Sequence, residues 1–133
     1  MACFLVSAAE AVVVTVAEKA QKKAEEKKVE NGEVSVEDSF HVPFSRKLKW
    51  LRNMLWGGAF LLLFEHIWHG EVQPFFPFLT AMENSADTAE MLKEMGTVGV
   101  TMALLVTAVW GVMCFVSSAI EKRARRESTA PEV

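Results

Sequence analysis

The chain has 133 residues, enough for one domain, and 51% of them are hydrophobic, gathered largely into three blocks. Too few residues remain outside these blocks for a sizeable soluble core, and a formal net charge of −3 gives no indication of nucleic-acid binding. The two cysteines, Cys3 and Cys114, lie in apolar segments, so the sequence does not indicate a disulfide framework. We therefore expect an all-α membrane protein with a single integral membrane domain over residues 1–133.

The first apolar block covers residues 2–17 and is interrupted only by Glu10. We predict a first transmembrane helix over about residues 2–18, although the block is short for a bilayer core of about 30 Å. One alternative is a signal peptide, which would need basic residues before the apolar run, whereas here the lysines follow it. The other alternative is a helix that lies on the membrane surface.

Lys and Glu residues are interleaved through residues 18–30, which are rich in strong helix formers. We expect this stretch to extend the first helix into the cytoplasm, as part of a charged loop over residues 19–47. Asn31 and Gly32 form a stop signal, because glycine readily adopts the left-handed conformation that ends a helix. The polar residues 33–40 are predicted to be a loop.

The second predicted span covers residues 48–68, and its helix is expected to open at Pro43 or Ser45. At 1.5 Å per residue it is about 30 Å long, which suits a bilayer core. Trp50 and Trp68 lie near its two ends, where interfacial belts of aromatic residues occur. Its first turns carry basic side chains that are expected to extend to lipid headgroups: Arg46, Lys47, Lys49 and Arg52.

The third predicted span covers residues 96–120, which contain no charged residue and would form a helix of roughly 37 Å. Before it, residues 69–95 are expected to form the outer loop, part of it lying in the membrane interface, because prolines break a helix and neighbouring phenylalanines are too apolar for open water. The sequence from Asp87 to Glu90 resembles a capping box, so we expect a helix to begin there and to run into the third span.

The basic residues predict the orientation of the spans. Of the 14 Lys and Arg residues, nine lie in the first loop and the start of the second span, four follow the third span, and one, Lys93, lies between the last two spans. The positive-inside rule then places the loop over residues 19–47 and the tail over residues 121–133 in the cytoplasm. The N-terminus and residues 69–95 are placed outside. We expect a multi-pass protein of the plasma membrane; if the first block does not span, the last two spans keep this orientation.

Glu10 is a candidate functional residue, because a carboxyl group in the middle of a membrane is costly and commonly serves transport. Cys3, Ser7 and Glu10 follow helical spacing, so they share a face that should point at protein. One alternative is structural, with a protonated Glu10 hydrogen-bonded across a helix interface. In another, Glu10 lies near the membrane surface.

Glu65, His66 and His69 share neighbouring positions on the second span, and a tight hairpin would bring them level with Lys93 and Glu94. This group offers contacts for protons or for a substrate. Two imidazoles with carboxylates could also bind zinc, but the cluster has no HExxH pattern and no cysteine partner, so we predict no metal site. The structural alternative pairs Glu65 with Lys93 to set the helix register.

Small residues recur every three to four positions in the third span, which allows helix backbones to approach closely in lipid. Gly57 and Gly58 in the second span offer a complementary hollow. We expect this ridge to pack within the chain, and a second subunit is the alternative occupant. The predicted ridge consists of Gly96, Gly99, Ala103, Thr107 and Gly111.

No Ser-His-Asp or Cys-His arrangement would be assembled by this topology, so we do not expect an enzyme, and His41 lies on the wrong side to pair with another histidine around a haem. We expect no cofactor. The preferred function is a non-enzymatic accessory or scaffold subunit, whose partners are the lipid bilayer and either further copies of the chain or a larger membrane protein.

The alternative function is a small oligomeric proton-coupled transporter that uses Glu10 and the group Glu65, His66 and His69. In its size and in the carboxylate of the first apolar block, the chain resembles small multidrug resistance transporters. That resemblance implies that Glu10 couples protons to a substrate. The chain departs from that family in having three predicted spans rather than four and a long charged loop, so the resemblance does not assign the activity.

Overall fold

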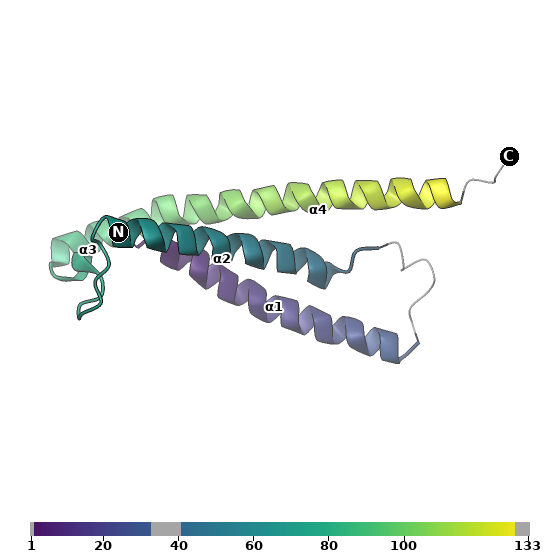
Figure 1. The fold of residues 1–133 in the computed structure, drawn as a ribbon, viewed down its shortest axis with the longest axis horizontal. Helices are drawn as coiled ribbons and strands as arrows, with labels where there is room; N and C mark the ends of the chain where they lie inside the picture. Colours follow the sequence, from purple (N-terminus) through teal and green to yellow (C-terminus); the bar gives the residue numbers. More distant parts are fainter. Residues whose placement is uncertain (1, 33–40, 130–133) are drawn as a thin grey trace.

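Three long helices lie side by side in alternating directions in the computed structural model of the chain (Figure 1). The structure describes residues 2–32 and 41–129. A loop and a short helix connect the second long helix to the third at one end of the molecule. The elements in chain order are α1 (Phe4–Glu30), α2 (Phe44–Trp68), η2 (Thr80–Met82), α3 (Ser85–Glu94), η3 (Met95–Gly99) and α4 (Val100–Ser128).

The predicted all-α fold with three long helices is confirmed, and the membrane prediction is supported in part. Within the described part of the chain, one helix is long and apolar enough to cross a membrane, the continuous helix over Ser85–Ser128, and only 11% of its most apolar window is buried. In α1 the apolar part ends at Ala17, so it measures only about 21 Å. In α2 the basic first turns and the pair Glu65-His66 shorten the apolar part in the same way.

The predicted end of α1 is confirmed: the helix stops at Glu30, Asn31 caps it, and Gly32 has a φ of +71°. The loop predicted for residues 33–40 lies outside the described residues, as do residues 130–133 of the tail. α2 starts directly after Pro43. Up to Ser128 the tail is helical, because α4 continues through it.

The predicted start of the helix before the third span was placed too late. α3 begins at Ser85, because Asn84 lies at the N-cap and its side-chain oxygen accepts a hydrogen bond from the Ala86 backbone N–H at 3.2 Å. Asp87 therefore sits inside the first turn, where its charge favours the positive end of the helix dipole. The helix then runs through the π-helical turn η3 into α4, which confirms the prediction that it continues into the third apolar block.

The largest helix contact joins α1 to α2, whereas the sequence pattern favoured a tight hairpin of the second and third spans. Ala11 and Val14 of α1 pack against a stripe of leucines on α2, Leu48, Leu51 and Leu55, whose spacing of three and four puts them on one face. Val106 and Trp110 of α4 pack against this cluster. In Figure 1, α1 diverges from α4 towards its Glu30 end.

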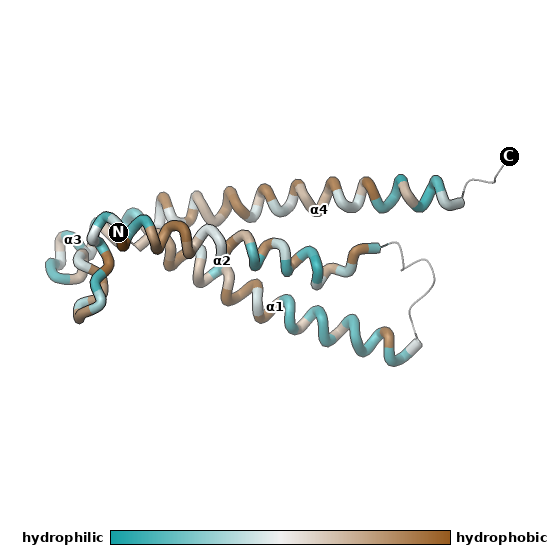
Figure 2. The backbone as a smooth tube through the Cα atoms, viewed as in Figure 1, coloured by the Kyte–Doolittle hydropathy of each residue, from teal (hydrophilic) through white to brown (hydrophobic). Residues whose placement is uncertain are grey.

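Much of the apolar surface remains uncovered on the outside of the helices. Figure 2 shows apolar residues along most of α4 and hydrophilic residues along the second half of α1 and at the end of α4. Exposed apolar surface of this extent marks a membrane or protein contact rather than a water-facing side. The exposed large side chains of α4 include Leu104, Leu105, Val112, Phe115 and Ile120.

Candidate functional site

Glu10 lies between α1 and α4, where its carboxyl oxygen Oε1 is 2.5 Å from the Thr107 hydroxyl. The same hydroxyl lies 3.0 Å from the carbonyl oxygen of Ala103, which it can reach as a donor. An ionised Glu10 accepts the hydroxyl hydrogen, whereas a protonated Glu10 can donate to Thr107 Oγ1 while Thr107 donates to Ala103. The contact therefore accommodates both protonation states of the carboxyl group.

The face of α1 that carries Glu10 points at protein, as its spacing predicted. Cys3 and Ser7 on that face are buried, and Glu10 is half-buried. Burial of a polar face on an otherwise apolar helix leaves the valines on the other side exposed, Val12 and Val13 among them.

The small-residue ridge runs from η3 into α4 and contacts α1 at Gly99 of η3. A Cβ atom added to Gly99 would lie 2.9 Å from Val6 Cγ2 and 3.4 Å from the Cys3 carbonyl oxygen, so the two backbones approach more closely than a side chain allows. Ala103, one turn later, is also buried. The close approach is thus made to the first turn of α1.

The expected fit of the ridge against Gly57 and Gly58 is not what the structure contains. A Cβ at either glycine, or at Gly96 or Gly111, would meet no atom within 4 Å. The α2 face that packs is the leucine stripe, and Gly57 lies away from it in an exposed position. These four glycines make no close helix contact within the described part of the chain.

The group at the other end of α2 separates into two pairs. His66 Nδ1 lies 2.8 Å from Glu71 Oε2, and the His66 ring lies 5.7 Å from the Phe4 ring. His69 Nε2 lies 4.0 Å from Glu65 Oε1, with both side chains largely exposed. The two pairs place imidazole beside carboxylate, an arrangement that can exchange protons.

Lys93 and Glu94 form no hydrogen bond or ion pair with Glu65 or His69 among the described residues, although the charge of Glu94 acts on the His66 ring. Lys93 is exposed, Glu94 is half-buried, and among residues 2–32 and 41–129 no ion pair links Glu65 to Lys93. Both residues instead line a shallow cavity of about 480 Å³ on α3 and η3, with Glu90 and Thr97. The described residues contain no group of three or more His, Cys, Asp or Glu side chains that could hold a metal ion.

Glu71 is a partner of His66 that the sequence reasoning missed. After α2 ends, Gly70 adopts a φ of +73°, and the Glu71 N–H donates to the His66 carbonyl oxygen at 2.9 Å while the Gly70 N–H donates to Ile67. This is the Schellman arrangement of a helix end, and it folds Glu71 back towards the last turn. The signal was the glycine one position after His69, followed directly by an acidic residue.

A second polar cluster, at the opposite end of the helices, was also missed. Lys47 is buried, its Nζ lies 3.5 Å from Glu121 Oε1 and donates to Ser118 Oγ at 3.2 Å, and its carbonyl oxygen accepts a hydrogen bond from Trp110 Nε1 at 2.7 Å. His41 Nε2 lies 3.8 Å from the other oxygen of Glu121. One lysine thus links the start of α2 to the end of the apolar part of α4.

Glu121 is the first residue after the apolar segment of α4. Burial raises the pKa of its carboxyl group, but the hydrogen bond from Ser117 at 2.9 Å and the charges of Lys47 and His41 outweigh burial, so the net pKa lies below the usual glutamate value. Glu121 therefore stays charged beside Lys47 at neutral pH.

The expectation that Lys47 and Arg52 extend to lipid headgroups was wrong. Arg52 Nη1 lies 2.8 Å from Glu18 Oε2 of α1, and both side chains are mostly covered. Lys47 comes four residues before Leu51, and Arg52 comes four residues after Leu48, so both lie on the packing face of α2. That spacing was the available signal; Arg46 and Lys49, off this face, are exposed.

No family model matches the chain, and the searches of curated proteins and of solved structures found no match either.

Proposed function

We propose that the chain is a small integral membrane protein whose three long helices cross the bilayer, with the N-terminus outside and the C-terminus in the cytoplasm. We propose further that it is a non-enzymatic accessory or scaffold subunit of a larger membrane complex. The observation that carries this proposal is the exposed apolar surface of α4, together with that of α2, which the described residues leave uncovered.

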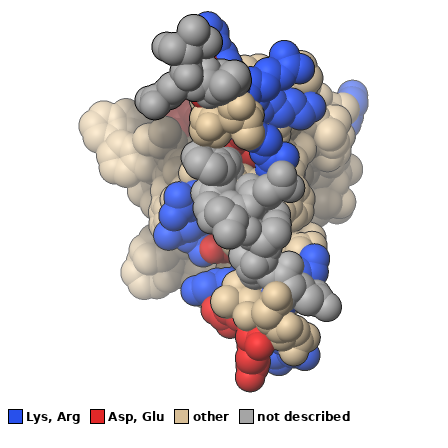
Figure 3. Space-filling view, turned by 90° about the vertical axis from the view of Figure 1, so that its right-hand side faces the viewer, with Lys and Arg blue, Asp and Glu red and all other residues tan. Residues whose placement is uncertain are grey.

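The charged residues at the edges of the apolar blocks support the same placement. Arg52 and Glu18 neutralise each other between α1 and α2, which lowers the cost of bringing both helices deeper into the bilayer. Figure 3, a view onto the end of the molecule that carries the C-terminus, shows several Lys and Arg side chains there together with acidic ones, whereas Lys93 lies in α3 at the other end. Such a one-sided distribution is typical of a cytoplasmic face.

Cysteine accessibility tests the placement. In a chain with Cys3→Ser and Cys114→Ser, a membrane-impermeant maleimide on intact cells is expected to label Glu83→Cys, which lies in the outer loop. Lys22→Cys and Glu127→Cys are expected to react only after permeabilisation, and an N-terminal epitope tag should be detected on intact cells. Labelling of Lys22→Cys on intact cells, or a hidden N-terminal tag, contradicts the three-span topology.

The accessory role is tested by purification of the native chain in mild detergent followed by mass spectrometry. The expected result is a fixed stoichiometry with a larger membrane protein. A chain that elutes alone or only with copies of itself, and that transports a substrate in proteoliposomes, contradicts the accessory role.

A second candidate, a small oligomeric proton-coupled transporter, is favoured by one contact, the hydrogen bond between Glu10 and Thr107. The Glu10 carboxyl group can keep a hydrogen bond to Thr107 both when it is ionised and when it is protonated. It can therefore take up and release a proton without disrupting the contact between α1 and α4. In this candidate the pair of His66 and Glu71, at the C-terminal end of α2, serves as the proton entry point.

Glu10→Gln tests the transporter, because glutamine keeps the hydrogen bond to Thr107 but cannot release a proton. If Glu10 carries protons, the variant should insert and assemble normally and lose proton-driven transport in proteoliposomes by at least tenfold, an order typical of losing an essential proton-transfer group. Thr107→Val is the companion variant, with weaker transport expected. Equal transport by the Glu10→Gln variant and the unmodified chain excludes Glu10 as the carrier.

A further inference from the structure

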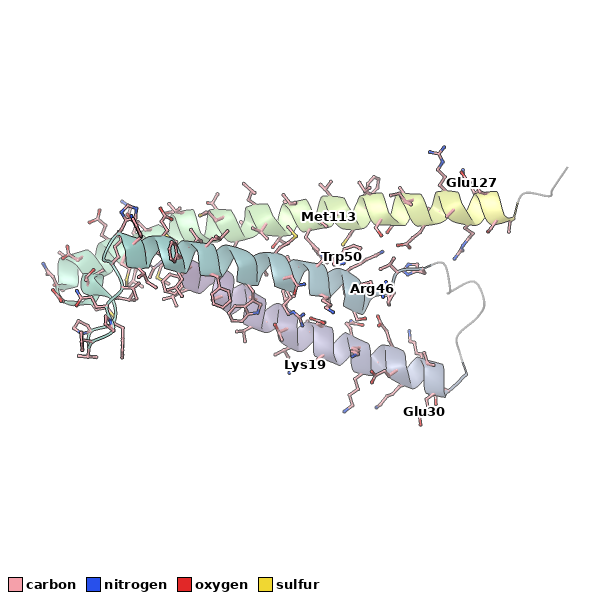
Figure 4. The ribbon with its side chains drawn as sticks, viewed as in Figure 1. Lys19, Glu30, Arg46, Trp50, Met113 and Glu127 are labelled. Carbon is pink, nitrogen blue, oxygen red and sulfur yellow. The ribbon has the colours of Figure 1, made fainter. Side chains whose placement is uncertain are left out.

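The loop between α2 and α3 folds into a short hairpin over residues 72–79, which we name the phenylalanine hairpin. The Gln73 N–H donates to the Phe78 carbonyl oxygen at 2.8 Å, and at the base the Thr80 N–H donates to the Glu71 carbonyl oxygen at 3.1 Å. In Figure 1 the loop projects sideways from the helix axes. Figure 4 shows side chains at its tip pointing away from the helices, at the end of the molecule opposite to the labelled Glu127.

The tip of the hairpin exposes three phenylalanine rings. The exposed fractions are 75% for Phe75, 87% for Phe76 and 62% for Phe78, and the last two rings lie edge to face with their centroids 6.4 Å apart. Aromatic rings gain more from burial than most side chains, so a cluster of three that packs on no helix marks a contact surface.

The backbone of the tip suits an environment with little water. No residue between Glu71 and Glu83 is charged, which leaves eleven uncharged residues in a row, residues 72–82. Pro74 and Pro77 have no N–H group that would need an acceptor. A segment without charge and with few backbone donors to satisfy loses little when it leaves water.

The helix ends set the depth at which the hairpin lies. The ring of Phe4, the first residue of α1, lies 5.7 Å from the ring of His66 in the last turn of α2, so these two helix ends are level. Trp68 is 80% exposed, and its ring lies 6.4 Å from that of Phe64, so an exposed aromatic face reaches the end of α2. The hairpin thus begins where this face ends, at the depth where aromatic side chains collect in membranes.

The base of the hairpin is acidic. A cavity of about 350 Å³ beside it is lined by four carboxylates and, among the described residues, by no Lys or Arg. Carboxylates keep this base in water and do not attract an anionic surface. The four are Glu71, Glu83, Asp87 and Glu90.

We propose that the tip of the phenylalanine hairpin inserts into the outer leaflet as a membrane anchor in addition to the helices. Phe75, Phe76 and Phe78 lie among the headgroups and the first methylene groups, while the acidic base stays in water. The occupant is the bilayer surface itself, because only residues 69–71 separate the hairpin from the end of α2 and because it projects across the helix axes, along that surface. The proposal rests on the bilayer placement proposed above.

The test reconstitutes the full-length chain, with Cys3→Ser and Cys114→Ser, into phosphatidylcholine vesicles that contain a nitroxide-labelled lipid. One environment-sensitive fluorophore is attached at Phe76→Cys, at Glu83→Cys or, as a marker of the helices, at Leu105→Cys. The fluorophore at Phe76→Cys is expected to emit at shorter wavelength, to be quenched by the nitroxide lipid and to be protected from aqueous iodide. That at Glu83→Cys should behave as in water. High salt should change neither, because the insertion involves no ion pair.

Removing the neighbouring rings is the second arm. Burial of one phenylalanine side chain favours insertion by about tenfold or more, so Phe75→Ser with Phe78→Ser should lower the ratio of inserted to water-exposed tips by about 100-fold. The fluorophore at Phe76→Cys should then become accessible to iodide. The matched pair Met82→Ser and Leu92→Ser, exposed apolar side chains outside the tip, should leave it protected.

Iodide quenching at Phe76→Cys as strong as at Glu83→Cys overturns the proposal, as does an equal loss of protection in the matched pair. Protection in native membranes but not in the vesicles overturns it in favour of a protein partner. The fluorophore at Leu105→Cys separates this proposal from the bilayer placement. If it is quenched by the nitroxide lipid while that at Phe76→Cys is not, only the hairpin anchor fails; if both lie in water, the bilayer placement fails as well.

Discussion

At the scale of single residues, the interior of this helix trio is held by polar contacts as well as by leucines. Lys47 connects three groups, the Glu121 carboxylate, the Ser118 hydroxyl and the Trp110 indole, of which the last bonds to its backbone carbonyl. A lysine so enclosed loses its water, and the carboxylate opposite supplies the compensating charge. Removing Lys47 therefore leaves the enclosed Glu121 carboxylate with the Ser117 hydroxyl and the His41 ring as its remaining partners.

Lys47→Met keeps the volume of the side chain and removes its charge. Because Glu121 stays charged in the enclosed site, the variant is expected to lose about 3 kcal/mol of stability, measured as a lower midpoint of thermal unfolding in detergent micelles by circular dichroism. The double variant Lys47→Met and Glu121→Gln should recover most of the loss. Lys49→Met, on the exposed side, is the control; an equal loss in both single variants contradicts a specific pair.

At the scale of helices, α1 supplies contacts that the sequence pattern assigned elsewhere. Glu25 of α1 accepts hydrogen bonds from the Ser45 backbone N–H at 3.1 Å and from the Ser45 hydroxyl at 2.5 Å. Pro43 occupies the N-cap of α2 and has no side-chain group to offer, so a carboxylate from another helix caps α2 instead. The charged half of α1 is thereby fixed beside the start of α2.

The first turns of α1 approach the chain closely at Gly99 of η3, just before α4. Gly99→Leu should separate the first turn of α1 from α4, because a Cβ alone already approaches Val6 to 2.9 Å, and overpacking of this kind costs about 1–3 kcal/mol. The measurement is again the unfolding midpoint in micelles. Gly96→Leu, where a Cβ meets open space, is the control and should change it far less; equal effects contradict the contact.

At the scale of the whole molecule, α1 contacts two partners, α2 through Ala11 and Val14 and α4 near its own N-terminal end. This arrangement brings residues separated by almost the full chain to one place, Glu10 to Thr107 and Val6 to Gly99. The charged second half of α1 diverges from α4, as Figure 1 shows, and remains tied to α2 through Glu18 and Glu25.

A designed disulfide tests this arrangement. A Cβ at Gly99 lies 3.4 Å from Val6 Cβ, close to the usual separation in disulfides of about 3.8 Å. In a chain with Cys3→Ala and Cys114→Ala, the pair Val6→Cys and Gly99→Cys is therefore expected to form an intramolecular disulfide on mild oxidation. Intact mass and gel mobility under non-reducing conditions measure it. Val6→Cys with Gly111→Cys should not cross-link; cross-linking of both pairs alike contradicts the fixed register.

The sequence by itself determined the three long helices and most of their ends. These are local properties of the chain. Helix propensity sets the helix lengths, glycine sets the stop at Asn31 and Gly32, and the absence of charge sets the apolar run over residues 96–120. The sequence also predicted that the face of α1 with Glu10 points at protein, because Cys3, Ser7 and Glu10 follow one another at helical spacing.

Only the tertiary structure decided which helices pair and which partners the ionisable side chains contact. Glu10 hydrogen-bonds to Thr107, Glu65 lies beside His69 rather than Lys93, and Lys47 points inward to Glu121. The helical spacing of residues predicts on which face of a helix a side chain lies, but it does not predict which helix packs against that face. Pairing depends on the summed burial of whole faces, and here the leucine stripe of α2 packs on α1 and leaves Gly57 and Gly58 without a close contact.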